Sequence, residues 1–424
     1  MSLKIVKPLV LMVILTLVLS LTFFSFSGAG VPKVHADAAV TVGSSAVDYP
    51  RIIRLAHNGS ANGTLITISD GFVPYKSTDN GNSWSPLPAP SIGSGQCCPG
   101  LFELPNAMGN LPAGAVLLAL TEGAGKTIEL YVSTDQGNNW THRSSIATGG
   151  QGNVVGLWEP EFAIDSSGNL VAYFSDERHQ SDGYNQLLGH EVSTDGGVTW
   201  SSEVYDVALN DGNARPGMAR VGKLPTGRYA MAYDVCGNPG CSVHIRTSSD
   251  GDNWGTASNL GTEVYASDGS YYVSSPGLAW SSVGGSNGEL ILVGKYLQNG
   301  TNGHQSGNTV FVTTDLSGQG TWYAEPAPVS VNVPSGGDHC ANYSTTLLPS
   351  DDGTSLLEAV GSFDGSGACR MLIGSAPTPT STSKTGSSGP IGAPGGKCVD
   401  ISNGNSTSGT AVQLWDCNGT NAQY

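Results

Sequence analysis

Basic side chains are scarce in this chain of 424 residues. It has 18 lysines and arginines against 34 aspartates and glutamates, and its formal net charge is −16. Nucleic acids and anionic membranes are polyanions, and an acidic surface repels both. The composition therefore argues against nucleic acid and membrane as partners, whereas a neutral polysaccharide or oligosaccharide remains compatible. We expect a monomer.

Long apolar runs are also rare. The chain has one, from Leu9 to about Phe24, and no second segment long enough to cross a bilayer. Two lysines precede this run and small residues follow it up to Ala36, which is the pattern of a secretory signal peptide. We therefore expect residues 1–36 to be a cleaved signal and the protein to be secreted, with an uncleaved N-terminal anchor as the alternative.

Histidine and cysteine lack the spacing of a zinc site, and no loop requires calcium. We therefore expect no bound metal and no cofactor, with a structural calcium in the channel left open as the alternative. Outside the cytosol, the eight cysteines are instead expected to form disulfides. Adjacent Cys97 and Cys98 bond either to each other or elsewhere in the chain. The other pairs expected from position are Cys236 with Cys241, Cys340 with Cys369, and Cys398 with Cys417.

A turn sequence rich in glycine recurs along the chain. Its Asp returns about every 60 residues, a period typical of propeller blades. We expect this Asp to accept backbone hydrogen bonds, the Gly to supply a positive φ, and the Trp to fill the space between neighbouring sheets. The copies are Ser77–Trp84, Ser133–Trp140, Ser193–Trp200, Ser248–Trp254 and Thr313–Trp322.

Six apolar segments, each led by glycine, are expected to open the blades, and their number predicts six blades. Five of these blades carry the repeated turn, and a strand near Val40 is expected to complete the sixth and close the ring. The chain is therefore predicted to be all-β, with a six-bladed β-propeller over residues 37–374. The six segments are 63–66, 114–118, 168–171, 227–230, 288–291 and 353–357.

The repeated turn resembles the Asp-box of the sialidase-like superfamily, which marks a fold and not an activity. Four further segments resemble family 93 of the glycoside hydrolases, the exo-α-1,5-arabinanases, and this resemblance extends over roughly residues 49–374. It implies a retaining hydrolase that trims linear arabinan from its end. The four segments are Trp158–Glu161, Ser175–Arg178, Arg215–Met218 and Tyr233–Gly237.

Carried over by position, the resemblance makes Glu159 the acid/base. The nucleophile falls on Asp234, where the family is expected to carry Glu. Asp is shorter by one methylene, about 1.5 Å, whereas a retaining site needs its carboxyl groups about 5–5.5 Å apart. Tyr343 matches an active-site tyrosine of the family and is expected to steady the nucleophile.

The candidate substrate-binding residues are Trp158, Arg51, Arg215 and Asp176. Salt bridges between blades are the alternative role for the two arginines, and a local ion pair among residues 176–178 is the alternative for Asp176. His190 is expected to be structural.

Two other functions remain open. A sialidase would use Tyr343 as nucleophile and three arginines, for which Arg51, Arg215 and Arg370 are available. A non-catalytic propeller that binds polysaccharide is the second.

Residues 375–394 are rich in Ser, Thr and Pro, which is a linker composition. Residues 395–424 resemble the first repeat of a ricin-type lectin, whose β-trefoil needs three such repeats, so this one is incomplete. The resemblance implies sugar-binding roles for Asp400, Trp415 and Asn418.

Overall fold

The computed structural model describes residues 39–43, 47–149, 156–237, 240–299, 304–305, 307–331, 333 and 339–381, and three short strands between 392 and 416. The expected signal peptide lies outside the described residues. In the described part the helical elements are two single 3-10 turns, η1 (Gly59–Ala61) and η2 (Gln180–Asp182). None of the helices described is long and apolar enough to span a membrane.

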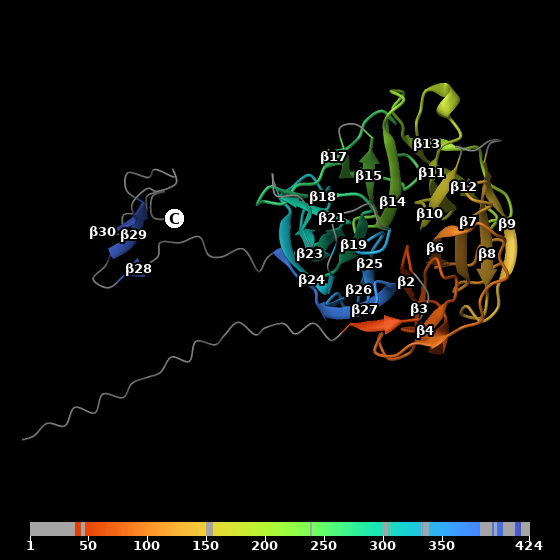
Figure 1. Ribbon diagram of the computed structural model, residues 1–424, viewed down its shortest axis with the longest axis horizontal. Coiled ribbons are helices and arrows are strands. Elements are labelled where there is room, and N and C mark those ends of the chain that lie inside the picture. Colours follow the sequence, from red (N-terminus) through yellow and green to blue (C-terminus); the bar gives the residue numbers. More distant parts are fainter. Residues whose placement is uncertain are drawn as a thin grey trace, which may run out of the picture. The chain divides into compact units, whose positions relative to one another are not determined.

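Six antiparallel sheets surround a central axis and form the blades of a β-propeller, as the sequence predicts (Figure 1). Blades 1 to 3 are β2 (Arg51–Arg54), β3 (Leu65–Ile68), β4 (Tyr75–Ser77) and β5 (Ser85–Pro86); β6 (Cys97–Glu103), β7 (Val116–Glu122), β8 (Thr127–Ser133) and β9 (Thr141–Thr148); and β10 (Leu157–Ile164), β11 (Leu170–Asp176), β12 (Leu187–Ser193) and β13 (Val204–Val207). Blades 4 to 6 are β14 (Arg215–Lys223), β15 (Tyr229–Cys236), β16 (Cys241–Ser248) and β17 (Thr262–Glu263); β19 (Gly277–Ser281), β20 (Glu289–Val293), β23 (Gly307–Thr313) and β24 (Tyr323–Val331); and β25 (Thr346–Pro349), β26 (Ser355–Phe363), β27 (Cys369–Pro377) and β1 (Val40–Val42).

The first strands of neighbouring blades contact one another in a closed ring of β2, β6, β10, β14, β19 and β25, so they are the innermost strands. The six glycine-led segments of the sequence are therefore the second strands, β3, β7, β11, β15, β20 and β26. The sequence was read as if these segments opened the blades. That interpretation was wrong by one strand, because the inner strands are broken by bulges and show a weaker apolar pattern.

The inner strands enter their sheets through unusual backbone. Each blade has a residue other than glycine with positive φ at this point, and in blades 2, 3 and 4 the strand register shifts there as in a β-bulge. Such conformations cost energy and gather at functional sites. The residues are Tyr49, Cys98, Glu159, Met218, Ser275 and Ser344.

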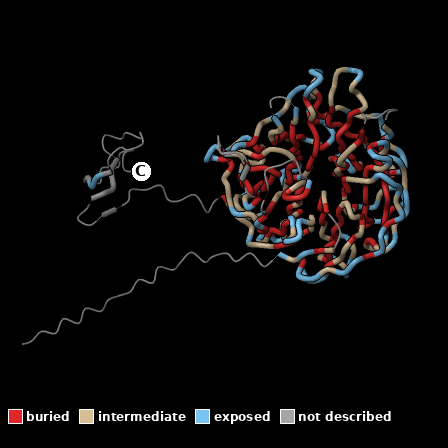
Figure 2. Tube along the Cα trace, in the orientation of Figure 1, coloured by how far each residue is buried: buried red, intermediate tan, exposed pale blue. Residues whose placement is uncertain are grey.

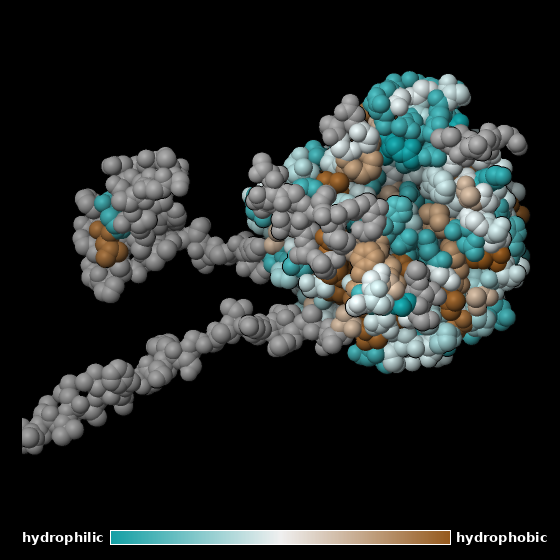
Figure 3. Space-filling view, viewed as in Figure 1, coloured by the Kyte–Doolittle hydropathy of each residue, from teal (hydrophilic) through white to brown (hydrophobic). Residues whose placement is uncertain are grey.

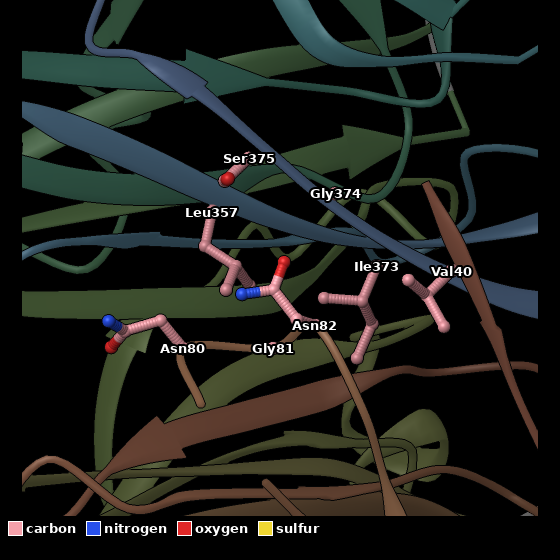
Figure 4. A pocket seen from close by; sticks show the side chains of 8 residues that line it. All are labelled: Val40, Asn80, Gly81, Asn82, Leu357, Ile373, Gly374 and Ser375. Carbon is pink, nitrogen blue, oxygen red and sulfur yellow. The ribbon is translucent and has the colours of Figure 1, made fainter. Parts of the chain in front are cut away.

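The N-terminal strand closes the ring, as predicted. β1 pairs with β27 of blade 6, with Val40 opposite Ile373. Figure 4 shows both side chains next to Leu357 and the first repeated turn. Gly81 of that turn has φ +90°, and a Cβ there would lie 3.2 Å from Leu357 Cδ1, so glycine allows blade 1 to pack on blade 6.

The repeated turns hold neighbouring blades together. In the third copy, Asp195 accepts hydrogen bonds from the backbone N–H groups of Val198 and Thr199, at 2.9 and 3.0 Å. Trp200 then donates to Ser144 of the preceding blade at 3.1 Å. Figure 2 shows buried residues through the sheets and exposed residues at their outer turns.

Blade 5 carries an insertion that reaches back to blade 4. Its strands β21 (Tyr296–Asn299) and β22 (His304–Gln305) extend β18 (Ser270–Val273), which also pairs with β16. The segments next to these strands bring Ser274, Ser275 and Lys295 toward the axis. The face in Figure 3 is hydrophilic over η2 and the loops near β13, with apolar residues in small separate areas.

Three disulfides are present in the described part of the chain: Cys97–Cys98, Cys236–Cys241 and Cys340–Cys369. The last two confirm the expected pairs. The open question about the adjacent cysteines is answered by a bond between them. Cys417, the expected partner of Cys398, lies outside the described residues.

The predicted linker begins too early. β27 continues to Pro377, and the backbone N–H of Ser381 donates to Glu289 at 3.1 Å, so this stretch still belongs to the propeller. Beyond it, β28 (Gly392–Ala393), β29 (Lys397–Ile401) and β30 (Val412–Asp416) pair with one another. Asp400 lies on β29 and Trp415 on β30, whereas Asn418 lies outside the described residues.

Candidate active site

A cavity of about 490 Å³ opens among the ends of the inner strands. Its size suits a small ligand or a few sugar rings. One wall comes from blades 3 and 4: Trp158, Glu159, Glu177, Gln186 and Arg215. The opposite wall comes from blades 1, 2 and 6: Asp48, Tyr49, Asp70, Cys97, Cys98, His339 and Tyr343.

Glu159 lies at the centre of the first wall. Its Oε2 accepts hydrogen bonds from Ser175 Oγ at 2.6 Å and from the Met218 backbone N–H at 3.1 Å, and Oε1 accepts from Tyr49 OH at 3.4 Å. Burial raises the pKa of this carboxyl, while the hydrogen bonds oppose the shift. The backbone of Glu159 has φ +63°, so β10 bulges here and directs the residue toward the axis.

Two tyrosines face Glu159 from the other wall. The hydroxyls of Tyr49 and Tyr343 are 3.1 Å apart, and their rings meet edge to face with centroids 5.1 Å apart. Burial raises the pKa of both phenols, so they stay neutral and remain hydrogen-bond donors. Lys295 Nζ lies 4.8 Å from the centre of the Tyr343 ring. The hypothesis that Tyr343 belongs to the site therefore agrees with its position.

Asp234 does not line the cavity. It is 3% exposed on β15, and its Oδ2 accepts a hydrogen bond from the Ser275 backbone N–H at 2.8 Å. Burial and the charge of Glu159 raise its pKa to about 8. A nucleophile must be ionised and reach the substrate. The structure places Asp234 near Glu159 but behind the wall, because its short side chain is held by the insertion of blade 5.

Gly217 separates these two carboxyl groups. It lies opposite Asp234 in the sheet, and a Cβ on it would lie 2.6 Å from both Ser175 Oγ and Gln186 Nε2. Ser175 holds Glu159, so we expect Gly217→Ala to displace the Glu159 carboxyl. Misplacing a catalytic group by about 1 Å costs on the order of 10²-fold in rate.

The measurement is kcat/KM on whichever glycan the protein cleaves. Gly222→Ala is the matched control, because Gly222 lies on the same strand and a Cβ there meets no atom within 4 Å. The control should keep wild-type activity. Equal rates for the two variants would contradict the packing argument.

Arg215 and Trp158 reach the cavity as the sequence predicts, and Glu177 holds both. Arg215 donates to Glu177 Oε1 at 2.5 Å and to Gln186 at 2.6 Å, and Trp158 Nε1 donates to Glu177 Oε2 at 3.2 Å. The Arg215 side chain is 35% exposed, so it can still contact a ligand. Sequence reasoning gave Glu177 only a local ion-pair role.

Arg51 and Asp176, two other predicted substrate-binding residues, do not line the cavity. Arg51 is 4% exposed and donates to the backbone oxygen and the hydroxyl of Ser344, at 3.0 and 3.1 Å. Asp176 is fully buried and accepts from Arg178 at 2.7 Å. Both therefore hold blades or loops together, which was the alternative interpretation for each.

The arginines do not form the triad that a sialidase would need. Arg51 is buried beneath the cavity, and Arg370 forms an ion pair with Asp364 at 2.9 Å on blade 6. Arg215 alone of the three lines the cavity. His190 is fully buried and contacts Asp206 at 2.9 Å, in keeping with a structural role.

One group of described residues has the spacing of metal ligands without a disulfide among them: Asp176, His179 and Glu203. The Arg178 guanidinium lies 2.7 Å from Asp176 and 3.1 Å from Glu203. The guanidinium offsets one negative charge, and burial together with the neighbouring Asp176 raises the pKa of Glu203 to about 9, so the pair leaves little net charge for a cation to balance. This group is therefore an ion-pair network on blade 3.

Sequence reasoning assigned no role to five residues of the cavity: Asp48, Tyr49, Asp70, Gln186 and His339. The sequence did contain a signal for Asp70. The pair Ser69-Asp70 comes directly after β3, the second strand of blade 1, and a similar pair, Ser175-Asp176, ends β11, the second strand of blade 3. Carboxylates that end equivalent strands lie at the same end of the propeller. That comparison between blades would have found it.

No protein-family model and no curated protein matches this chain. Several solved structures do match it. An α-L-arabinanase of Penicillium chrysogenum in complex with arabinobiose is 27% identical, with a TM-score of 0.67, covering 81% of this chain and 99% of that one. An α-L-arabinofuranosidase of Fusarium graminearum is 23% identical, with a TM-score of 0.66, covering 81% and 98%.

A more distant neighbour is the microbial sialidase Hz136 from a Hadza sample. It is 16% identical with a TM-score of 0.53, covering 78% of this chain and 66% of the other. These likenesses agree with the six-bladed propeller fold. The arabinanase and the arabinofuranosidase are glycoside hydrolases, and a structure of the latter is described as family 93. This chain is therefore a propeller similar to those hydrolases.

Proposed function

We propose that this chain is a secreted glycoside hydrolase that trims arabinan-type plant polysaccharide from its end by a retaining mechanism. The observation that carries the proposal is the cavity at the ends of the inner strands, with the Glu159 carboxyl fixed in its wall by Ser175 and Met218. Two structural neighbours were solved with arabinobiose, which supports a similar substrate here.

The proposed chemistry uses side chains alone. Glycoside hydrolysis requires one carboxyl group that donates a proton and one carboxylate that stabilises positive charge at the anomeric carbon. Glu159 supplies one of these groups. The neutral phenols of Tyr49 and Tyr343 can donate hydrogen bonds to it or to the sugar, and Arg215 can bind a hydroxyl near the opening.

A non-catalytic carbohydrate-binding propeller is the second candidate. The burial of Asp234 favours it, because the nucleophile expected from the sequence does not reach the cavity. A sialidase is disfavoured, since a carboxylated sugar would meet four carboxyl side chains in the cavity and only one arginine: Asp48, Asp70, Glu159 and Glu177, against Arg215.

The test is to incubate the mature protein with debranched arabinan and to follow released sugars by chromatography. We expect one short product to accumulate from the start, and EDTA to leave its rate unchanged. A spread of long products would indicate internal cleavage. Retardation in an arabinan-containing gel without any released sugar would favour the binding propeller instead.

A further inference from the structure

The second carboxyl group of the proposed reaction has to be found in the cavity, because Asp234 is sealed behind its wall. Of the residues that the structure describes, three acidic ones besides Glu159 line the cavity. Glu177 is committed at both oxygens, to Arg215 on one side and to Trp158 and the Gly156 backbone on the other. The remaining two, Asp48 and Asp70, lie on the wall opposite Glu159.

Asp70 is held firmly by its surroundings. It follows β3, and its backbone N–H donates to the Asp48 oxygen at 3.1 Å. Its Oδ1 accepts a hydrogen bond from the Cys98 backbone N–H at 2.9 Å. Cys98 itself is fixed by the bond to Cys97 and has φ +62°. Among the described residues, Oδ2 of Asp70 has no hydrogen-bond partner, so one oxygen is left for a ligand.

The carboxyl groups on the two walls of the cavity differ in their hydrogen bonds and neighbouring charges. Burial raises the pKa of Glu159 as well, but this carboxyl receives three hydrogen bonds, which favour the ionised form and oppose that rise. Asp70 receives one, and it lies close to the second acid Asp48, which favours the protonated form. Burial is the largest cause that raises the pKa of Asp70, to about 7, with Arg51 opposing it. Pairs of acids whose environments differ in this way divide into proton donor and carboxylate.

We propose that Asp70 is the proton donor of the site and that Glu159 is the carboxylate facing it, in place of the pair Glu159 and Asp234. This inference rests on the proposed function. In the first step the Asp70 proton passes to the glycosidic oxygen while the bond to the anomeric carbon breaks, and Glu159 bonds to that carbon. In the second step water adds to the carbon, its proton returns to Asp70, and Glu159 is released.

Substrates with different leaving groups test this division. A dinitrophenolate can leave as an anion, without being protonated. A sugar leaving group needs a proton, because its alkoxide is too basic to leave. We therefore expect Asp70→Asn to lose about 10²- to 10⁴-fold in kcat/KM on debranched arabinan, the range for a general acid. On 2,4-dinitrophenyl α-L-arabinofuranoside the loss should stay below about tenfold, which also shows that the variant is folded.

The pH profile is a second measurement. In the wild type, kcat/KM on arabinan should fall as pH rises through the pKa of Asp70, because the donor loses its proton. With the dinitrophenyl substrate, whose leaving group needs no proton, this basic limb should be absent from the wild type and from Asp70→Asn alike. The titratable groups that interact with Asp70 are Asp48, Arg51 and Tyr49, and they remain unchanged in the variant.

Asp234→Asn is the matched control, since it makes the same replacement at a buried Asp outside the cavity. It should not show the leaving-group pattern. The proposal is overturned if Asp234→Asn shows that pattern, or if Asp70→Asn cleaves arabinan at the wild-type rate. It is also overturned if kcat/KM of Asp70→Asn falls equally on the two substrates. A wild type that cleaves neither substrate would instead overturn the proposed function.

Discussion

Glu159→Gln is expected to lose on the order of 10⁴- to 10⁶-fold in kcat/KM on arabinan while keeping its fold, since this is the scale for removing the nucleophile or its charged partner from an enzyme. The amide has the shape of the carboxyl group. Its oxygen can still accept from Ser175 Oγ and the Met218 N–H, which Glu159 Oε2 does now. What the variant loses is the charge, which the reaction needs at the anomeric carbon. Kinetics and circular dichroism on the same preparation separate activity from folding.

Glu161→Gln provides the control on the same strand. Glu161 forms an ion pair with Arg220 at 2.9 Å and does not line the cavity. We expect this variant to keep most of the activity, even if the loss of the ion pair lowers its stability. A Glu159→Gln enzyme with the wild-type rate would show that the chemistry, if present, takes place elsewhere.

Trp322→Ala is expected to cause the largest loss of stability. The Trp322 side chain is 1% exposed and belongs to the apolar cluster that includes Ile245 of blade 4 and Phe311 of blade 5. Replacing a buried Trp by Ala costs about 3–5 kcal/mol, from lost burial and from the cavity left behind. The indole N–H also donates to the Gly318 oxygen at 3.0 Å, and that bond disappears too.

Trp84→Ala is its matched control. Trp84 occupies the same place in the first repeated turn and donates to Gly81 at the same distance of 3.0 Å, but it is only partly buried. Urea unfolding of both variants therefore compares one hydrogen bond at two degrees of burial. The free energy of unfolding should fall clearly less for Trp84→Ala than for Trp322→Ala. Equal losses would mean that the turn, and not the packing between blades, determines the contribution.

The architecture was predictable because it depends on local, repeated chemistry. The Asp, Gly and Trp of each turn serve contacts within a few residues or with the preceding blade, so their spacing revealed the blades. The closing strand near Val40 followed from the need to complete a sixth sheet. The order of strands within a blade was less readable, because the bulges at Cys98, Glu159 and Met218 interrupt the inner strands.

The site was only partly predictable because burial depends on the whole ring. Glu159, Tyr343, Arg215 and Trp158 meet at the cavity, although they come from three blades: 3, 4 and 6. Asp234 looked equivalent to a catalytic carboxyl by position. Its burial depends on Ser275, which lies between β18 and β19 and is distant in the sequence. The residues around Asp234 therefore give no sign of this contact.

The pairing of β1 with β27 has a consequence for biosynthesis. The strand that emerges first from the ribosome, Val40–Val42, receives its partner only when Cys369–Pro377 has been made. Until then, β1 has no partner strand in blade 6 and the ring stays open. Completion of the native propeller must therefore wait until β27 has been made, so a chain interrupted before this strand leaves an unprotected edge for aggregation or proteolysis.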